Sequence, residues 1–300
     1  MNLLVVGTVA FDDIETPHGR RDRILGGSAT YFSYASSFFT DVGLVGAVGE
    51  DFPDEHVALL AKKGIDVSGL RVIEGEKTFH WSGRYVGDMN EAETLDTRLN
   101  VLQGFSPEIP DEMKKTPFVF LANAEPRLQL SVIDQLEDTA FLVCDTMNLW
   151  INTALDGLKE VLKRIDCLIV NDQEARMLTG ENNIVAAGDA LRAMGPRTLI
   201  IKRGEYGAFL CGDEGRFAIP AYPVRTVIDP TGAGDSFAGG TVGFLASRGR
   251  ADFGDIKKAM AYGTVVASFN VEDFSLDNFL RINREDIDRR YREFVEFVSF

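Results

Sequence analysis

The sequence predicts an α/β fold in three layers, with helices on both faces of a parallel sheet. Two observations carry this prediction. Short apolar runs typical of buried strands recur along the chain, and helical patterns of about 10–15 residues lie between them. Alternation of this kind favours parallel strands joined by helical crossovers. With 300 residues, of which 45% are hydrophobic, the chain can bury a sizeable core, and we expect one domain over residues 1–300.

The N-terminal part begins with an apolar run over residues 3–9, which predicts the first buried strand. The Gly26–Gly27 pair precedes a predicted helix over residues 28–39, with Ser28 as its N-cap. A second apolar run over residues 42–48 predicts another strand. A helix is then expected over residues 53–63, ended by a glycine.

The rest of the chain repeats this pattern and ends in helices. Strands are expected at 118–122, 141–145, 167–170 and 198–202, and helices at 128–136, 152–164, 173–178 and 185–194. A hairpin is expected over 207–219, and three helices over 235–247, 255–269 and 285–298.

Two segments interrupt the alternation, at about residues 13–25 and 76–104. The first contains a polar stretch, and the second alternates apolar residues such as Phe79 and Trp81 with polar ones. We interpret both segments as a small β-strand lid on the main domain. Exposed strand edges favour pairing with a second copy, so a homodimer through this lid is one expectation.

The charge balance excludes several classes of partner. Lys and Arg number 31 against 46 Asp and Glu, a net charge of −15, which argues against nucleic acid or an anionic membrane surface as a partner. No apolar run reaches the length of a membrane span, and the N-terminus lacks the basic start of a signal peptide. The three cysteines match no metal-site spacing, and the three histidines are too few for a histidine-rich metal centre. A cytoplasmic protein with reduced thiols is the resulting expectation.

A glycine-rich string in the C-terminal half is the strongest candidate for chemistry. Small residues at Gly232, Ala233 and Gly234 allow a tight backbone turn close to a ligand. Because a helix starts near Asp235, several N–H groups and the helix dipole point at one spot, which suits a phosphate. Since a carboxylate repels a phosphate, Asp235 at the rim is best explained as a base toward a hydroxyl group. A glycine turn with Asp235 as a helix cap is the alternative.

The longer string Asp229–Gly240, DPTGAGDSFAGG, resembles the C-terminal signature of the ribokinase-like (PfkB) carbohydrate kinases. Gly26–Thr30 is similar to the N-terminal signature of that family. The resemblance covers nearly the whole chain, and it implies a ribokinase-like fold and transfer of the γ-phosphate of ATP to a hydroxyl group of a sugar or related polyol. Two further family features match in the same order, Asn171-x-x-Glu174 and Lys202-x-Gly204-x-x-Gly207.

The resemblance also implies roles for these residues. Asp235 would take the proton of the substrate hydroxyl, and Gly232, Ala233 and Gly234 would form the anion hole. Asn171 and Glu174 would order Mg²⁺ through water, since Mg²⁺ retains much of its hydration shell. Their spacing is equally that of a capping box at a helix N-terminus, and both interpretations can hold together.

The acceptor site is the part that the resemblance leaves open. It places Asp12 on the sugar hydroxyls beside Gly26 and Gly27, with the adjacent Asp13 as the competing assignment. Tyr31 stands where the family usually has an asparagine that touches substrate. We therefore keep nucleoside and inositol kinases of the same family as alternatives, and we expect a neutral acceptor because Asp12 would repel a second phosphate.

The nucleotide site is expected, by the same resemblance, around Lys202, Gly204, Gly207, Thr231 and Gly263. In the family, backbone groups near Asp229 and Thr231 and the loop after Ser268 often hold a monovalent cation such as K⁺, which makes K⁺ a further candidate cofactor beside ATP and Mg²⁺.

Three other functions compete with this interpretation. A nicotinamide dehydrogenase needs Gly-x-Gly-x-x-Gly after the first strand, and residues 7–12 do not match it. A Walker-type NTPase needs Gly-x4-Gly-Lys-Ser/Thr, which is absent from the sequence. A non-catalytic sugar-binding relative would be expected to lose the base or the anion hole, and both are intact here.

Overall fold

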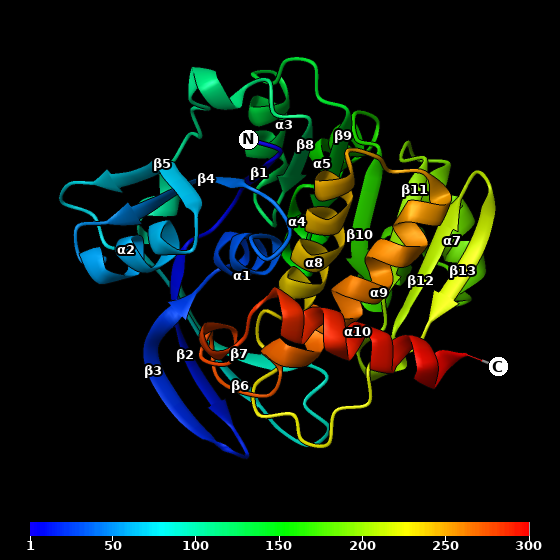
Figure 1. Cartoon of the computed structure of the whole chain (residues 1–300). Coiled ribbons are helices and arrows are strands. Elements are labelled where there is room, and N and C mark those ends of the chain that lie inside the picture. The colour runs from blue at the N-terminus through cyan, green and yellow to red at the C-terminus, as the bar shows by residue number, and fades with distance from the viewer. Residues whose placement is uncertain (300) are drawn as a thin grey trace.

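The computed structural model describes residues 1–299 and contains a nine-stranded sheet and a four-stranded sheet (Figure 1). In the large sheet the strand order is β13-β12-β11-β10-β9-β8-β1-β4-β5, and all pairs from β11 to β5 are parallel. Only the β11–β12 and β12–β13 pairs are antiparallel. The strands are β1 Leu3–Val6, β4 Val42–Gly49, β5 Ile65–Ile73, β8 Phe118–Leu121, β9 Phe141–Asp145, β10 Cys167–Asn171, β11 Thr198–Lys202, β12 Ala208–Gly212 and β13 Gly215–Ile219.

Helices cover both faces of this sheet, as the sequence predicts. Successive residues of strand β1 face opposite sides of the sheet. Leu3 and Val5 pack with α1, α8, α9 and α10, whereas Leu4 and Val6 pack with α3, α5, α6 and α7. In Figure 1 the first helix group lies in front of the strands. Strands buried on both faces explain the continuous apolar runs. The helices are α1 Ser28–Ser36, α2 Asp54–Lys62, α3 Pro126–Ile133, α4 Asn148–Thr153, α5 Leu155–Leu162, α6 Asp172–Thr179, α7 Ile184–Arg192, α8 Ala233–Arg248, α9 Phe253–Asn270 and α10 Arg284–Val298.

The small β-strand lid expected from the sequence is present as the second sheet, with strand order β3-β2-β6-β7. Its strands are β2 Ala10–Thr16, β3 Gly19–Gly26, β6 Phe79–Tyr85 and β7 Ala92–Arg98. The outer pairs are antiparallel, and the central β2–β6 pair is parallel. We call these four strands the small sheet.

Some sequence-based boundaries were wrong and one strand was not expected, each for a local reason. The first strand ends at Val6, because the chain then turns and enters the small sheet at β2. Strand β5 was not expected, since this edge strand carries polar residues and a glycine. The helix expected over 152–164 is two helices, α4 and α5, separated at Ala154. Helix α1 is shorter than expected, and its N-cap is Gly27, because Ser28 is already helical and its hydroxyl pairs with Thr8.

Within residues 1–299, none of the helices is both long and apolar enough to traverse a bilayer.

Candidate active site

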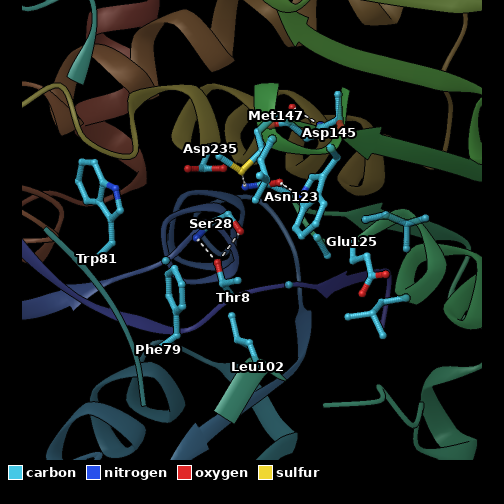
Figure 2. A pocket seen from close by; sticks show the side chains of 18 of the residues that line it. Thr8, Ser28, Phe79, Trp81, Leu102, Asn123, Glu125, Asp145, Met147 and Asp235 are labelled. Atoms are coloured by element: carbon cyan, nitrogen blue, oxygen red, sulfur yellow. Dashed lines mark hydrogen bonds between the residues drawn. The ribbon is translucent and has the colours of Figure 1, made fainter. Parts of the chain in front are cut away.

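A cavity of about 850 Å³ opens at the carboxyl edge of the large sheet. It is lined by residues at or just after the ends of five parallel strands: Gly7 after β1, Asn123 after β8, Asp145 in β9, Glu174 after β10 and Lys202 in β11. Crevices at the carboxyl ends of parallel strands are the usual ligand sites of open α/β sheets. Side chains of the small sheet complete the wall, including Phe79 and Trp81 (Figure 2).

The glycine-rich turn lies at this cavity and leads into helix α8. Gly232 has a φ of 74°, and a Cβ atom there would lie 2.4 Å from the Tyr31 ring, so only glycine is compatible. Gly232, Gly234 and Asp235 line the cavity, whereas Ala233 does not and donates its N–H to the Pro230 carbonyl. The first N–H groups of a helix have no partner within it, so this turn can bind an anion.

Asp235 stands in an environment that suits a general base. Burial raises its pKa to about 7, and Asp145 contributes to the increase, while the ammonium group of Lys202 opposes it. A base titrating near neutral pH combines a large deprotonated fraction with useful proton affinity. Asp235, Asp145 and Asn123 all line this cavity and are labelled in Figure 2.

Lys202 brings the positive charge to this end of the cavity. Its Nζ atom lies 3.2 Å from Oδ2 of Asp145, and a Cβ atom on Gly234 would lie 3.1 Å from the same Nζ atom. Burial lowers the pKa of Lys202, but Asp145, Glu174 and Asp235 outweigh this effect, and the net shift is upward. The ammonium group therefore stays charged beside the first turn of α8.

Asn171 and Glu174 form the capping box that their spacing predicts. The Asn171 side chain accepts from the Glu174 N–H at 2.7 Å, and the Glu174 carboxylate accepts from the Asn171 N–H at 2.8 Å. Glu174 also lines the cavity, and burial together with Asp145 raises its pKa to about 7. Asn171 does not line the cavity. Glu174 therefore caps helix α6 and is also accessible to a ligand in the cavity.

The donor set fits a hydrated Mg²⁺ rather than a metal held by the protein alone. Across residues 1–299, no three His, Cys, Asp or Glu side chains are grouped to bind a metal ion by themselves. Asp145, Glu174 and Asp235 nevertheless all line one cavity. Mg²⁺ that keeps its water molecules and shares substrate phosphates needs no more than such distributed carboxylates.

Asp12 and Asp13 point to different surroundings, because successive residues of strand β2 face opposite sides. Asp12 lines the cavity and is 4% exposed, and burial, with Asp229 next in effect, raises its pKa to about 8. Asp13 does not line the cavity; its carboxylate accepts from the Arg23 N–H at 2.8 Å and lies 3.0 Å from His80 Nε2. Of the two carboxylates, Asp12 is the one that can reach a ligand.

The predicted neighbours of Asp12 are brought together with it. A Cβ atom on Gly26 would lie 1.9 Å from the Asp12 carboxylate, so glycine makes room for that side chain. Gly27 lines the cavity with a φ of 94° and donates its N–H to Asp12. Tyr31 also lines the cavity, and its buried hydroxyl has no hydrogen-bond partner among residues 1–299.

Only some of the residues predicted to hold the nucleotide line the cavity. Thr231 lines the cavity, and its hydroxyl donates to Tyr85 of the small sheet at 3.3 Å. Gly204 and Gly207 lie outside it, in the turn between β11 and β12, both with positive φ. Gly263 packs against α8, where a Cβ atom would lie 2.2 Å from Thr241.

Asp145 and Asn123 are among the cavity-lining side chains to which sequence reasoning assigned no role. The Asn123 amide accepts from the Trp150 indole N–H at 2.9 Å and donates to the Met147 sulfur at 3.0 Å. Both missed residues lie at or just after predicted strands, so the carboxyl-end rule could have found them.

A family of known proteins and several individual relatives match most of this chain. The model of the pfkB family carbohydrate kinases matches residues 5–282. The chain is 32% identical to a cytidine kinase of Thermococcus kodakarensis over 258 residues, which cover 83% of this chain and 90% of that protein. It is 27% identical to a nucleoside kinase of Methanothermobacter thermautotrophicus, over 91% of this chain and 90% of the relative.

Solved structures share the fold at lower identity. A nucleoside kinase of Burkholderia thailandensis in complex with inosine has a TM-score of 0.78 and 19% identity, covering 97% of this chain and 98% of that one. A candidate ribokinase II from E. coli in complex with ATP and Mg²⁺ has a TM-score of 0.80 and 18% identity, covering 97% and 99%. The family match, the cytidine kinase relative and the shared fold lead to one conclusion: this chain belongs to the pfkB family of carbohydrate kinases.

Proposed function

We propose that this kinase transfers the γ-phosphate of ATP to a ribose hydroxyl group of a nucleoside. The observation that carries the proposal is the mixed lining of the cavity. One part presents carboxylates, among them Asp12 and Asp235, and the remainder is largely apolar and aromatic. The apolar lining includes Phe79, Trp81, Leu102, Phe105, Leu128 and Trp150.

A nucleoside matches both parts of this lining. Its ribose offers hydroxyl groups to carboxylates, which accept several hydrogen bonds each. Its base offers a flat apolar surface that stacks on aromatic rings. A free pentose carries hydroxyl groups over most of its surface, and burying these against apolar walls would leave them unpaired at a cost in free energy. The kinship with cytidine and nucleoside kinases supports the same acceptor class.

In the proposed reaction Asp235 accepts the proton of the acceptor hydroxyl as the hydroxyl oxygen bonds to the γ-phosphorus, while the bond from that phosphorus to the β,γ-bridging oxygen breaks and ADP leaves. ATP supplies the phosphoryl group, and a hydrated Mg²⁺ held near Glu174 would neutralise phosphate charge. The N–H groups around Gly232 and Gly234 and the ammonium of Lys202 stabilise negative charge at the transferred group. This division of labour suits phosphoryl transfer, which depends on positioning and electrostatic stabilisation.

Asp12, Gly26 and Gly27 are proposed to hold the ribose, with Tyr31 beside it. We further propose that the chain works as one kinase domain whose lid is the small sheet, within segments 13–25 and 76–104. The Thr231–Tyr85 hydrogen bond supports the lid, because it ties the end of β6 to the anion-binding turn. The Gly204–Gly207 turn is proposed to contact the nucleotide; Asn90, in the β6–β7 loop, lies 3.5 Å from Glu205 there.

The small sheet also offers two edge strands, β3 and β7, and all seven residues of β7 are exposed. Unpaired edges of this kind can join a second copy. A homodimer through the lid therefore stays a prediction, and light scattering on the purified protein measures it directly.

An acceptor screen tests the proposed function. ADP formation is followed with cytidine, other nucleosides, ribose, ribose 1-phosphate, hexoses and inositols at equal concentrations. We expect nucleosides to be turned over with the highest kcat/KM. Preferred turnover of ribose, an inositol or a sugar phosphate would contradict the nucleoside assignment, and no turnover of any acceptor would favour the non-catalytic relative.

A matched pair of variants tests whether the aromatic side chain of Trp81 stacks on the base of the nucleoside. Trp81→Ala should raise KM for the nucleoside roughly 5- to 150-fold, which is the usual loss of affinity when one base–aromatic stacking contact is removed. KM for ATP should stay unchanged. Leu95→Ala, on the exposed strand β7 and outside the cavity lining, is the control and should leave both constants unchanged.

A further inference from the structure

The last residue of α9, Asn270, is bonded to the anion-binding turn at two points. Its Nδ2 atom donates to the Thr231 carbonyl at 2.8 Å, and its Oδ1 atom accepts from the Ser236 hydroxyl at 2.7 Å. The side chain is 1% exposed. Because a carbonyl oxygen can only accept, the amide nitrogen must face Thr231, so the orientation of the amide is determined.

These two contacts bracket the turn. Thr231 directly precedes Gly232, and Ser236 directly follows Asp235. Both ends of the segment that carries the anion hole and the base are thus bonded to one side chain from another helix. A catalytic turn that is held at both ends moves less. Its reacting groups therefore stay in position, which favours phosphoryl transfer.

The segment after Asn270 continues this attachment. The Val271 carbonyl accepts from the Ile228 N–H at 2.7 Å, just before the turn. The Ser275 hydroxyl donates to the carbonyl of Leu25, the residue before Gly26 and Gly27. The C-terminal end of α9 and the chain that follows it therefore connect the anion-binding turn with the proposed acceptor site.

The oxygen atoms that the family resemblance would assign to a monovalent cation in this region already accept hydrogen bonds from the chain. The Thr231 carbonyl takes the Asn270 N–H, and the Asp229 carboxylate takes the N–H groups of Thr231 at 2.9 Å and Ser275 at 3.5 Å. Hydrogen-bond donors from the chain already face the oxygens that a cation would need. A cation placed there would meet the positive ends of these N–H dipoles.

We propose that Asn270 is a positioning residue that takes the place of a monovalent cation, so that phosphoryl transfer by this protein does not depend on K⁺ or Na⁺. The amide supplies the positive dipole at the Thr231 carbonyl and holds the turn in its catalytic shape. The proposal concerns the turn and not the acceptor, so it does not require the acceptor to be a nucleoside.

The experiment compares four proteins in KCl, NaCl and tetramethylammonium chloride at equal ionic strength. They are the wild type, Asn270→Asp, Asn270→Ala and Asn278→Ala. Asn270→Asp keeps size and the Ser236 contact but removes the donor at Thr231. Asn278 bonds the Phe269 carbonyl at 2.7 Å and so supports the same end of α9 without reaching the turn, which makes it the matched control. Rates with the best acceptor of the screen and Tm are measured in each salt.

The wild type should show the same kcat and Tm in all three salts. Both Asn270 variants should lose about 10- to 100-fold in kcat in tetramethylammonium chloride, because a buried carbonyl loses its donor. KM for ATP should stay unchanged, and KCl should restore part of kcat and raise Tm in these variants. Asn278→Ala should lower Tm in every salt alike and leave kcat unchanged.

Three results would overturn the proposal: a wild type that needs K⁺, an Asn270→Asp protein with wild-type kcat, or Asn270 variants that respond to salt as Asn278→Ala does. The Tm comparison requires no acceptor. If no acceptor is turned over, the proposed kinase function fails by itself, and a wild-type Tm that rises specifically with KCl still decides against this inference.

Discussion

The Lys202 ammonium lies 3.2 Å from the Asp145 carboxylate, and these two side chains come from neighbouring regions of the large sheet 57 residues apart in sequence. Asp235 and Glu174 both raise the pKa of this ammonium. The Lys202 ammonium therefore interacts with three carboxyl groups at this end of the cavity, those of Asp145, Glu174 and Asp235. In the proposed reaction, phosphate groups bound there would meet carboxylates, and Mg²⁺ would have to accompany the nucleotide.

Removing the proposed base should lower turnover without affecting nucleotide binding. Asp235→Asn is expected to reduce kcat by roughly 10²- to 10⁴-fold, the usual contribution of a general base. KM for ATP should change little, since the N–H groups of the turn remain. Steady-state kinetics with the best acceptor measures both constants. Near-normal turnover would exclude Asp235 as the base.

The pH dependence of the reaction should follow Asp235. Because burial raises its pKa to about 7, with Asp145 adding to the shift, kcat should fall as the pH drops below about 7 and the base becomes protonated. Lys202→Met removes the group that lowers this pKa, so the midpoint should move to higher pH. Lys159→Met, on the exposed part of α5, is the control. An unchanged midpoint in Lys202→Met would show that the Lys202 ammonium does not influence the pKa of Asp235.

The dual role of Glu174 can be divided by one substitution. Glu174→Gln keeps an oxygen that can accept the Asn171 N–H, so the capping box survives while the negative charge is lost. The Mg²⁺ concentration for half-maximal activity should rise, and Tm should change little, because charge holds the hydrated metal. Asn183→Ala removes the N-cap of α7 and should cost about 1 kcal/mol of stability with no effect on Mg²⁺. A lower Tm with unchanged Mg²⁺ dependence in Glu174→Gln would leave capping as its only role.

The two adjacent aspartates should differ in their effect on the acceptor. Asp12→Ala is expected to reduce kcat/KM for the acceptor by about 10- to 100-fold, since a buried hydroxyl loses its partner, with KM for ATP nearly unchanged. Asp13→Ala is the matched control, because that carboxylate is engaged with Arg23 and His80 outside the cavity. Normal kinetics in Asp12→Ala would transfer the acceptor contact to Asp13 or to the arginines of β3.

The stability of the free protein should decrease as the pH rises from about 5 to 8. The pKa of Asp12 is raised from 3.8 to about 8, and that of Asp235 from 3.8 to about 7, in both cases mainly by burial. In this window the folded state holds protons that the unfolded chain has released, so raising the pH favours unfolding. Thermal unfolding should give a higher Tm near pH 5.5 than at pH 8. Asp12→Asn should flatten this slope, and an unchanged slope would remove Asp12 as its cause.

Features that depend on neighbours in the chain were predictable from the sequence. The proposed anion-binding turn needs small residues and a helix start within a few positions, and Gly232 to Asp235 display both. The Asn171–Glu174 capping box follows from a spacing of three residues. Buried parallel strands show as apolar runs because both of their faces need apolar side chains. Strand β5 was not predictable, because an edge strand has a weaker demand for apolar residues.

Only the tertiary structure decided which distant side chains meet. The pleat of β2 selected Asp12 over Asp13, and the strand order placed Asp145 beside Lys202. The packing of α9 on α8 brought Asn270 to Thr231, 39 residues away. By itself the sequence determined the fold class and the glycine-rich turn that leads into a helix with Asp235 in its first turn, since backbone geometry and capping are local. Pairing across the sheet and between helices depends on how whole elements pack, and the spacing of residues does not record it.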